Sequence, residues 1–179
     1  MTDFAVKAVT GDTWPDLELL FEGRGGPKYC WCMAWRELED RTSAGSTARK
    51  KALHGRVVQG VPIGLLGYVR GKPVAWCSVA PRETFLRLSK DQDDQEAGIW
   101  SVVCFFVQRD HRKVGLSARM LDAAAQVAKA SGARVLEGYP VDPDSPSYRF
   151  MGFAKLFHER GFQLLGRTGS RRYVMRLDL

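Results

Sequence analysis

The most constraining feature of the sequence is an almost continuously apolar run, residues 100–107, followed after a short basic segment by a helical pattern. The run is rich in β-branched and aromatic residues, which is typical of a strand buried on both faces of a sheet. Residues 116–130 repeat Leu, Met and Ala at helical spacing and end at a Ser-Gly pair. A strand, a tight loop and a helix in direct succession predict an α/β fold.

The rest of the chain supplies further strands and helices around this unit. Alternation and turn residues predict further strands at 3–9, 63–69, 74–79, 134–141, 162–165 and 172–177. Helices are predicted from Asp12 or Thr13 to Gly23, at 46–59 and at 148–160. The expected order is β, α, α, β, β, β, α, β, α, β, β, with a long polar connection over residues 81–98.

The size and composition favour one globular domain. The chain has 179 residues, 45% of them hydrophobic, so residues 1–179 are expected to share one core. No apolar stretch approaches the roughly 18 to 20 residues of a membrane-spanning helix, and the first residues lack the pattern of a secretory signal. We therefore expect a cytoplasmic protein without a membrane partner.

The net charge of +7, from 27 Lys and Arg against 20 Asp and Glu, favours anionic partners. Candidates are nucleic acid, an acidic membrane surface or a phosphate-bearing cofactor, although the charge is also explained by solubility alone. Basic residues are spread along the chain without a dense arm or a regular stripe. A nucleic-acid partner is therefore not expected.

The four cysteines do not form a recognisable site. Cys30 and Cys32 lack the spacing of redox and zinc motifs, whereas Cys77 and Cys104 lie in apolar strand-like runs. We expect neither a disulfide scaffold nor a bound metal.

The basic loop before the second half of the chain has the properties of a phosphate site. A helix that begins at Leu116 presents unpaired backbone N–H groups, and the positive end of its dipole attracts phosphate. Gly115 permits close approach of the backbone, and Arg109, Arg112 and Lys113 add positive charge. A solvated turn before a surface helix is the alternative.

Two segments resemble the GNAT superfamily of N-acetyltransferases. Residues 112–117, Arg-Lys-Val-Gly-Leu-Ser, match the first and fourth positions of the signature Arg/Gln-x-x-Gly-x-Gly/Ala, with Ser117 as the last small residue. Residues 156–162 resemble the closing helix of the family and its Gly-Phe entry into the sixth strand. The resemblance implies an α/β GNAT fold, with a mixed central sheet of about six to seven strands flanked by about four helices.

The resemblance also implies a cofactor, acetyl-CoA, and direct attack of a primary amine on its thioester in a ternary complex. The backbone near Phe106 and Val107 would bind the pantetheine arm, with a donor that polarises the thioester carbonyl. Phe157 stands where many members carry a Tyr that protonates the departing thiolate, and it is assigned to the cofactor site. The residues implied to bind the pyrophosphate are Arg112, Lys113, Val114, Gly115, Leu116 and Ser117.

Proton transfer is assigned to Glu137 and Tyr148. Glu137 lies in the middle of a predicted strand, where a charged residue is costly unless it is paired or used, and it matches a catalytic glutamate of some family members. Pairing with Arg134 or Arg149 is the alternative. Because Phe157 replaces the usual Tyr, Tyr148 is the first candidate for the acid, with Tyr139 and His158 as substitutes.

The acceptor amine is expected to meet an aromatic segment, residues 29–35. Tyr29, Trp31 and Trp35 are assigned to the acceptor site, and Glu83 to the pairing of its ammonium. The alternative is that the tryptophans fill the core.

Two other functions compete with an acetyltransferase. A GNAT-fold protein that binds CoA without turnover would explain the missing Tyr, and a basic nucleic-acid-binding module would explain the charge. The sequence does not identify the amine, and we allow for a homodimer.

Overall fold

The apolar run predicted as a strand forms β4 (Ile99–Val107), the central strand of a seven-stranded sheet. The computed structural model describes residues 3–39 and 44–179, and the order of strands is β1-β2-β3-β4-β5-β7-β6. Neighbours are antiparallel except for β4 and β5, which are parallel. The predicted α/β class, mixed sheet and order of elements are confirmed.

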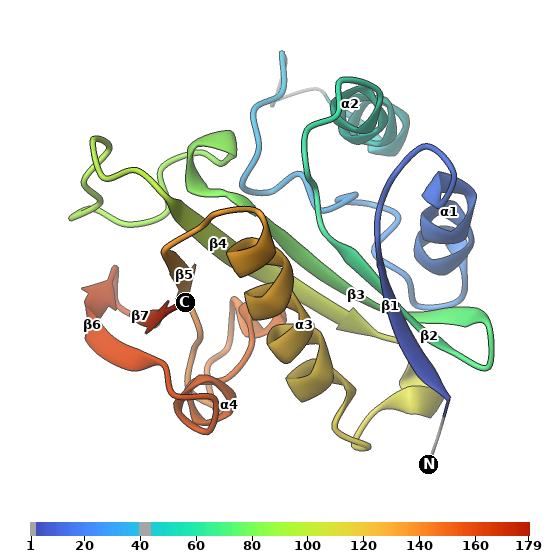
Figure 1. Cartoon of the computed structure of the whole chain (residues 1–179). Coiled ribbons are helices and arrows are strands. Elements are labelled where there is room, and N and C mark those ends of the chain that lie inside the picture. Colours follow the sequence, from blue (N-terminus) through green and yellow to red (C-terminus); the bar gives the residue numbers. More distant parts are fainter. Residues whose placement is uncertain (1–2, 40–43) are drawn as a thin grey trace.

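Within the described residues, the fold is made up of seven strands and four helices (Figure 1). The other strands are β1 (Phe4–Ala8), β2 (Leu65–Val69), β3 (Lys72–Pro81), β5 (Val135–Gly138), β6 (Gln163–Thr168) and β7 (Arg172–Asp178). The helices are α1 (Trp14–Glu22), α2 (Ser46–Val58), α3 (Leu116–Ala130) and α4 (Ala154–His158), with 3-10 turns η1 (Arg82–Thr84), η2 (Arg109–His111) and η3 (Arg149–Met151).

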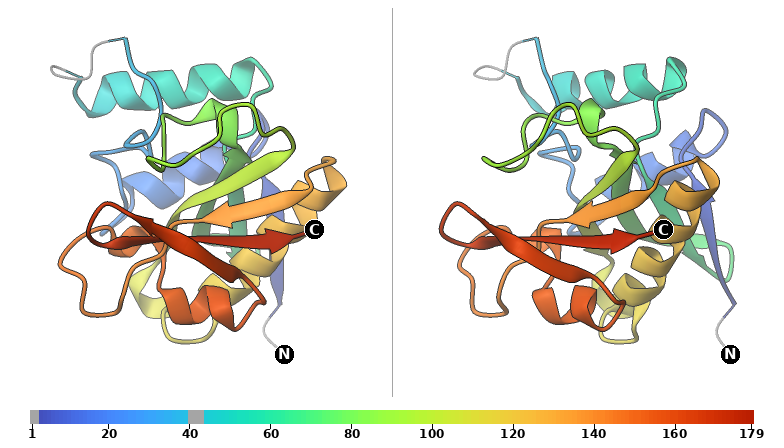
Figure 2. Two further views of the ribbon diagram at one scale, coloured as in Figure 1. Left: turned by 90° about the vertical axis from the view of Figure 1, so that its left-hand side faces the viewer. Right: turned by 60° about the vertical axis from the view of Figure 1, so that its left-hand side comes forward.

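Helices cover both faces of the sheet. The apolar side of α3 packs on β3 and β4, and α4 lies on the same face (Figures 1 and 2). On the opposite face, α1 and α2 enclose a second core cluster that includes Trp14, Phe21 and Leu53. No helix in residues 3–39 and 44–179 is long and apolar enough to cross a membrane.

The strands β4 and β5 pair over only part of their length and then diverge. Their pairing runs from Ile99 opposite Val135 to Val102 opposite Gly138, and no further. The register against β3 also shifts between Val102 and Cys104, which leaves Val103 as a bulged residue. From Val103 to Val107, β4 therefore has a strand neighbour only on the β3 side, and we call its other side the open edge of β4.

The single helix predicted over residues 148–160 is wrong. The structure has η3, then Gly152 with φ of +90°, and then the short α4. A left-handed φ interrupts a right-handed helix, and a side chain on Gly152 would also meet the rings of Phe157 and Phe105. The strand predicted over 134–141 is likewise shorter, because Val141 leaves the sheet and bridges only to Phe153.

Candidate active site

The open edge of β4 leads directly into the basic loop. Residues 99–103 are buried, but Cys104 to Val107 are only partly covered, so the predicted burial on both faces holds only for the first half of the strand. A cavity of about 450 Å³ lies along the second half. Its walls are the end of β4, the start of α3, η3 and the approach to α4, and its lining residues are Phe105, Phe106, Val107, Arg112, Ser117, Arg149, Phe150, Gly152, Phe153 and Leu156.

The loop between β4 and α3 turns sharply through left-handed backbone. Lys113 has φ of +65° and Gly115 has φ of +80°. The Arg112 side chain donates from Nε to the Val107 carbonyl at 2.8 Å, which ties the loop to the end of β4. The predicted helix begins at Leu116 as expected, and no side chain caps its first turn. Its free N–H groups and the exposed Arg109, Arg112 and Lys113 form a positively polarised end of the cavity.

The residues assigned to the cofactor fall into three groups. Phe106, Val107, Arg112 and Ser117 line the cavity. Lys113, Val114 and Gly115 are exposed at its basic end, and Leu116, the first residue of α3, is buried in the core.

Phe157 lies in the core and does not line this cavity. Its side chain is fully buried, with its ring edge-on to Phe105 and Phe162 at centroid distances of 6.2 and 5.0 Å. It also packs closely against Gly138 and Gly152, where any larger residue would collide with the ring. Phe157 therefore supports the cavity wall from behind, and direct contact with a cofactor is not part of this geometry.

Glu137 is buried, with 2% of its surface exposed, and both of its carboxylate oxygens are engaged. Oε2 accepts a hydrogen bond from Arg176 Nε at 2.6 Å, and Oε1 accepts one from the Tyr139 hydroxyl and lies 3.6 Å from Arg82 NH1. Its cationic partners are thus Arg82 and Arg176. They are not the two arginines considered from the sequence, because Arg134 and Arg149 donate to backbone carbonyls instead.

Tyr139 belongs to the same buried network. Its hydroxyl also lies 3.2 Å from Ser101 Oγ, on the neighbouring strand. Burial, followed by the nearby Glu137 carboxylate, raises the pKa of Tyr139 well above its ordinary value. Tyr139 therefore stays protonated near neutral pH and can serve as a hydrogen-bond donor.

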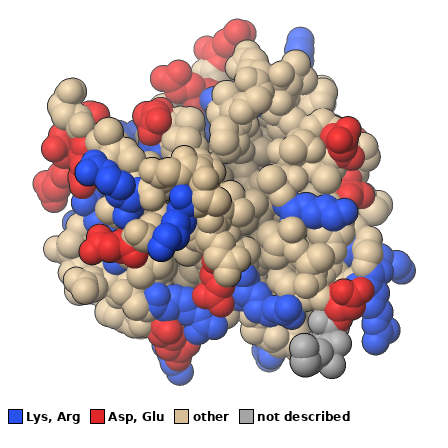
Figure 3. Space-filling view, in the orientation of Figure 1, with Lys and Arg blue, Asp and Glu red and all other residues tan. Residues whose placement is uncertain are grey.

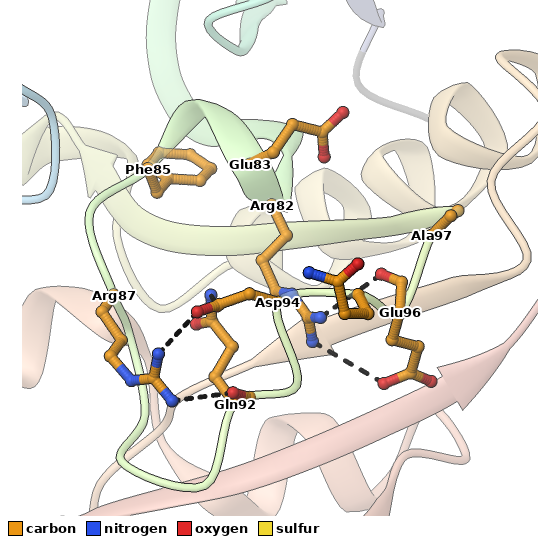
Figure 4. Close-up of a pocket in the computed structure, with 10 residues that line it drawn as sticks. Arg82, Glu83, Phe85, Arg87, Gln92, Asp94, Glu96 and Ala97 are labelled. Carbon is orange, nitrogen blue, oxygen red and sulfur yellow. Dashed lines mark hydrogen bonds and ion pairs between the residues drawn. The ribbon is translucent and has the colours of Figure 1, made fainter.

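Glu83 borders a second cavity of about 450 Å³, beneath the connection between β3 and β4. Inside it, Glu96 lies 3.9 Å from Arg82 and also accepts two hydrogen bonds of 2.9 Å from Arg176. The Glu83 carboxylate points away from the Arg82 and Glu96 pair (Figure 4). Glu83 is exposed, so its carboxylate is accessible to a ligand. No contact within the described residues orients it into this cavity.

The aromatic segment of residues 29–35 is divided between core and surface. Trp31 is buried against Trp14 and Phe21, with ring centroids 5.9 and 5.2 Å away, which favours the packing role left open by the sequence. Tyr29 is 73% exposed. Only Trp35, which is partly buried, meets another residue assigned to the site.

Trp35 and Tyr148 lie together, although they come from connections far apart in the chain. Their ring centroids are 6.4 Å apart. Arg172, at the start of β7, lies over both rings, with its Cζ 4.5 Å from Trp35 and 5.2 Å from Tyr148. Sequence reasoning missed Arg172, because its proximity to these rings depends on two separate connections and the start of β7, and leaves no local pattern.

Comparison with known proteins agrees with the fold. Residues 31–162 match the model of the acetyltransferase (GNAT) family. The ribosomal-protein-alanine N-acetyltransferase from Brucella melitensis has a similar structure, with 17% identity, a TM-score of 0.60 and coverage of 98% of this chain and 99% of that chain. The yncA protein from Salmonella typhimurium, solved with its cofactor acetyl-CoA, is also similar, with 16% identity, a TM-score of 0.60 and coverage of 99% of this chain and 95% of that chain.

An N-acetyltransferase from Staphylococcus aureus Mu50 is also similar, with 11% identity, a TM-score of 0.61 and coverage of 99% of both chains. At these identities the likeness concerns the fold. No curated protein sequence matches the chain. Because the family model spans most of its length, the protein belongs to the GNAT acetyltransferase family.

Proposed function

We propose that the protein is an acetyl-CoA-dependent N-acetyltransferase that moves an acetyl group to a primary amine by direct attack in a ternary complex. One observation carries the proposal: the open edge of β4 continues into a loop with free helix N–H groups and exposed basic side chains. An elongated ligand with an amide-containing arm and a pyrophosphate fits that succession, because the strand edge suits the arm and the loop suits the phosphates.

The cofactor would lie along the cavity beside β4. Backbone groups of Phe106 and Val107 would hydrogen-bond the pantetheine arm in the manner of an added strand. Residues 112–117 would hold the pyrophosphate. This arrangement brings the thioester to the region of Val103 and Cys104, where the strands separate and a backbone donor can polarise the carbonyl.

The acceptor ammonium must lose a proton before its nitrogen can attack the thioester. Glu137 remains the candidate base, and Arg82 and Arg176 hold its carboxylate in place. Both oxygens are already engaged, however, so uptake of a proton requires Tyr139 or Arg176 to release one of them. Tyr148 is the candidate acid for the CoA thiolate, because it is 37% exposed and lies beside η3, which borders the cavity.

The competing nucleic-acid reading receives little support from the charge distribution. On the face seen in Figure 3, basic and acidic side chains are interspersed and form no continuous basic stripe. A duplex or single strand would be expected to follow such a stripe.

The proposal is tested by calorimetry with acetyl-CoA, followed by measurement of free CoA released with a broad panel of amines. We expect acetyl-CoA binding and amine-dependent release. Binding without release by any amine would favour a CoA-binding protein without turnover. Absence of binding would remove the proposal altogether.

A further inference from the structure

Arg172 is a half-buried cation without an anionic partner in the described part of the chain. Its NH1 donates to the Leu88 carbonyl at 2.9 Å, and its guanidinium lies against the rings of Trp35 and Tyr148. None of the carboxylates in residues 3–39 and 44–179 forms an ion pair with it. Burial lowers the pKa of Arg172. The charge is therefore held in a place where it is only partly compensated.

A second polar group in the same cluster also lacks a partner. The indole N–H of Trp35 is buried and donates to no acceptor within the described residues. Buried donors are rarely left unsatisfied, because a donor removed from water without a partner loses its hydrogen bonds to solvent. Two neighbouring groups, one cationic and one neutral, thus both require an acceptor of hydrogen bonds.

This cluster borders the place where β4 and β5 separate. The residue after Arg172, Tyr173, donates its backbone N–H to the Pro140 carbonyl at 2.8 Å, just beyond the end of β5. On the other side, Trp35 packs against a core cluster that contains Val103, with Cys104 also packed against it. Trp35 and Arg172 are therefore tied to β4 near Val103 and Cys104 and to the residues just after β5, close to the end of the proposed acetyl-CoA path.

We infer that Arg172 binds an anionic oxygen group of the acceptor, so that the preferred substrates are amines that also carry a carboxylate. The inference rests on the proposed function and specifies its acceptor. The carboxylate would supply the missing partner of the guanidinium and an acceptor for the Trp35 N–H, once Tyr148 yields access to it. The rings of Trp35 and Tyr148 would cover the apolar part of the same substrate.

A purely cationic acceptor fits this cluster poorly. The guanidinium already occupies the faces of both rings, where an ammonium would otherwise bind. A second positive charge would meet repulsion from Arg172. An acceptor carboxylate removes that repulsion and leaves the amine free to reach the thioester.

The test compares acceptors in matched pairs: L-phenylalanine with L-phenylalaninamide, β-alanine with its amide, and glycine with aminomethylphosphonate. The first two pairs ask whether a carboxylate is required, and the third distinguishes carboxylate from phosphonate. Each is measured as kcat/KM with the wild-type protein, Arg172→Gln and Arg172→Lys. Arg171→Gln is the control, because it removes the same charge from the adjacent exposed residue, which bonds only to Ser147 Oγ at 2.8 Å.

We expect the wild-type protein to prefer an acid over its amide by about 10- to 100-fold, the range of a charge-assisted hydrogen bond. Arg172→Gln should abolish that preference by reducing activity on the acid alone, whereas Arg171→Gln should preserve it. An acid-to-amide ratio near one in the wild-type protein would overturn the inference, whether or not the variants fold. Equal loss on both members in a folded Arg172→Gln protein would overturn it as well.

A separate binding experiment distinguishes failure of this inference from failure of the proposed function. If no amine releases CoA, the proposed function fails, and the acids are then titrated by calorimetry into protein saturated with CoA. Binding of L-phenylalanine or β-alanine that Arg172→Gln removes would still support an anion site. Absence of acid binding to the wild-type protein would overturn the site.

Discussion

Replacing Glu137 with Gln decides whether this buried carboxylate holds the fold or takes a proton. The substitution keeps the shape of the side chain and removes its charge. Arg176 Nε, 2.6 Å away, and Arg82 NH1, 3.6 Å away, then lose their closest anion. Removal of one partner from a buried ion pair costs about 3–5 kcal/mol in general.

The structure places the expected loss at the lower end of that range. Arg176 keeps two hydrogen bonds of 2.9 Å to the Glu96 carboxylate, and Arg82 keeps contacts with backbone carbonyls of the same connection. We therefore expect a loss of about 3 kcal/mol. In a chain of this size, that corresponds to a melting temperature lowered by roughly 6–12 °C.

The assay combines thermal melting, acetyl-CoA calorimetry and kcat as a function of pH. Glu159→Gln serves as the control, because Glu159 is an exposed carboxylate outside the candidate site, paired on the surface with Lys155 at 3.7 Å. If Glu137 is also the base, kcat near neutral pH should fall by about 10²-fold or more. That deficit should shrink at high pH, where the free amine is abundant, while acetyl-CoA affinity stays unchanged.

A melting temperature within about 2 °C of the wild-type value would refute the argument that Glu137 pins the two arginines. A destabilised variant with normal kcat would instead assign Glu137 a structural role alone. The search for the base would then move to Glu83.

Three further predictions concern other parts of the chain. Gly115→Asp should weaken acetyl-CoA binding by several kcal/mol and Gly115→Asn much less, because a side chain there meets no protein atom within 4 Å and only Asp adds charge. Similar affinities of the two variants for acetyl-CoA in calorimetry would contradict this prediction. Trp31→Ala should cost roughly 3–5 kcal/mol of stability, whereas Trp35→Ala should chiefly raise the KM for the amine. Melting temperature and KM are measured on both variants, and a stable Trp31→Ala protein with a raised amine KM would contradict this prediction. A hydrogen bond from Cys104, assisted by Arg36, lowers the pKa of Cys32 to about 6. The contribution of the Cys32 thiolate to the free energy of unfolding should therefore grow as the pH rises from about 6 towards the pKa of a free thiol, and be lost on acidification. Cys32→Ala should remove this dependence of the melting temperature on pH.

The fold could be predicted wherever a signal is local and periodic. The predicted bounds of the helix at 116–130 match those of α3, because the apolar spacing and the glycines beyond both ends indicate the same limits. The failure at 148–160 has a physical cause that no local pattern reveals. Gly152 adopts a left-handed conformation, and the ring of Phe157 fills the space that a side chain there would need.

The partners of Glu137 were missed for a related reason. The sequence favours arginines that are near in the chain, such as Arg134, whereas the structure uses Arg82 and Arg176. Arg176 reaches Glu137 because β7 pairs directly with β5, with the two residues opposite each other in register. That pairing is a property of the whole sheet.

The two halves of the candidate site differ in how the chain specifies them. The cofactor half is continuous, since residues 105–117 supply a strand edge, a basic loop and a helix start in one stretch. The acceptor half is assembled from Trp35 and Tyr148, which lie on two separate connections, and from Arg172 at the start of β7. None of these three residues belongs to β4, to the basic loop or to α3, so their replacement leaves the strand edge and the start of the helix in place. Acceptor preference in this fold can therefore vary while acetyl-CoA binding is retained, and it has to be inferred from contacts such as those of Arg172.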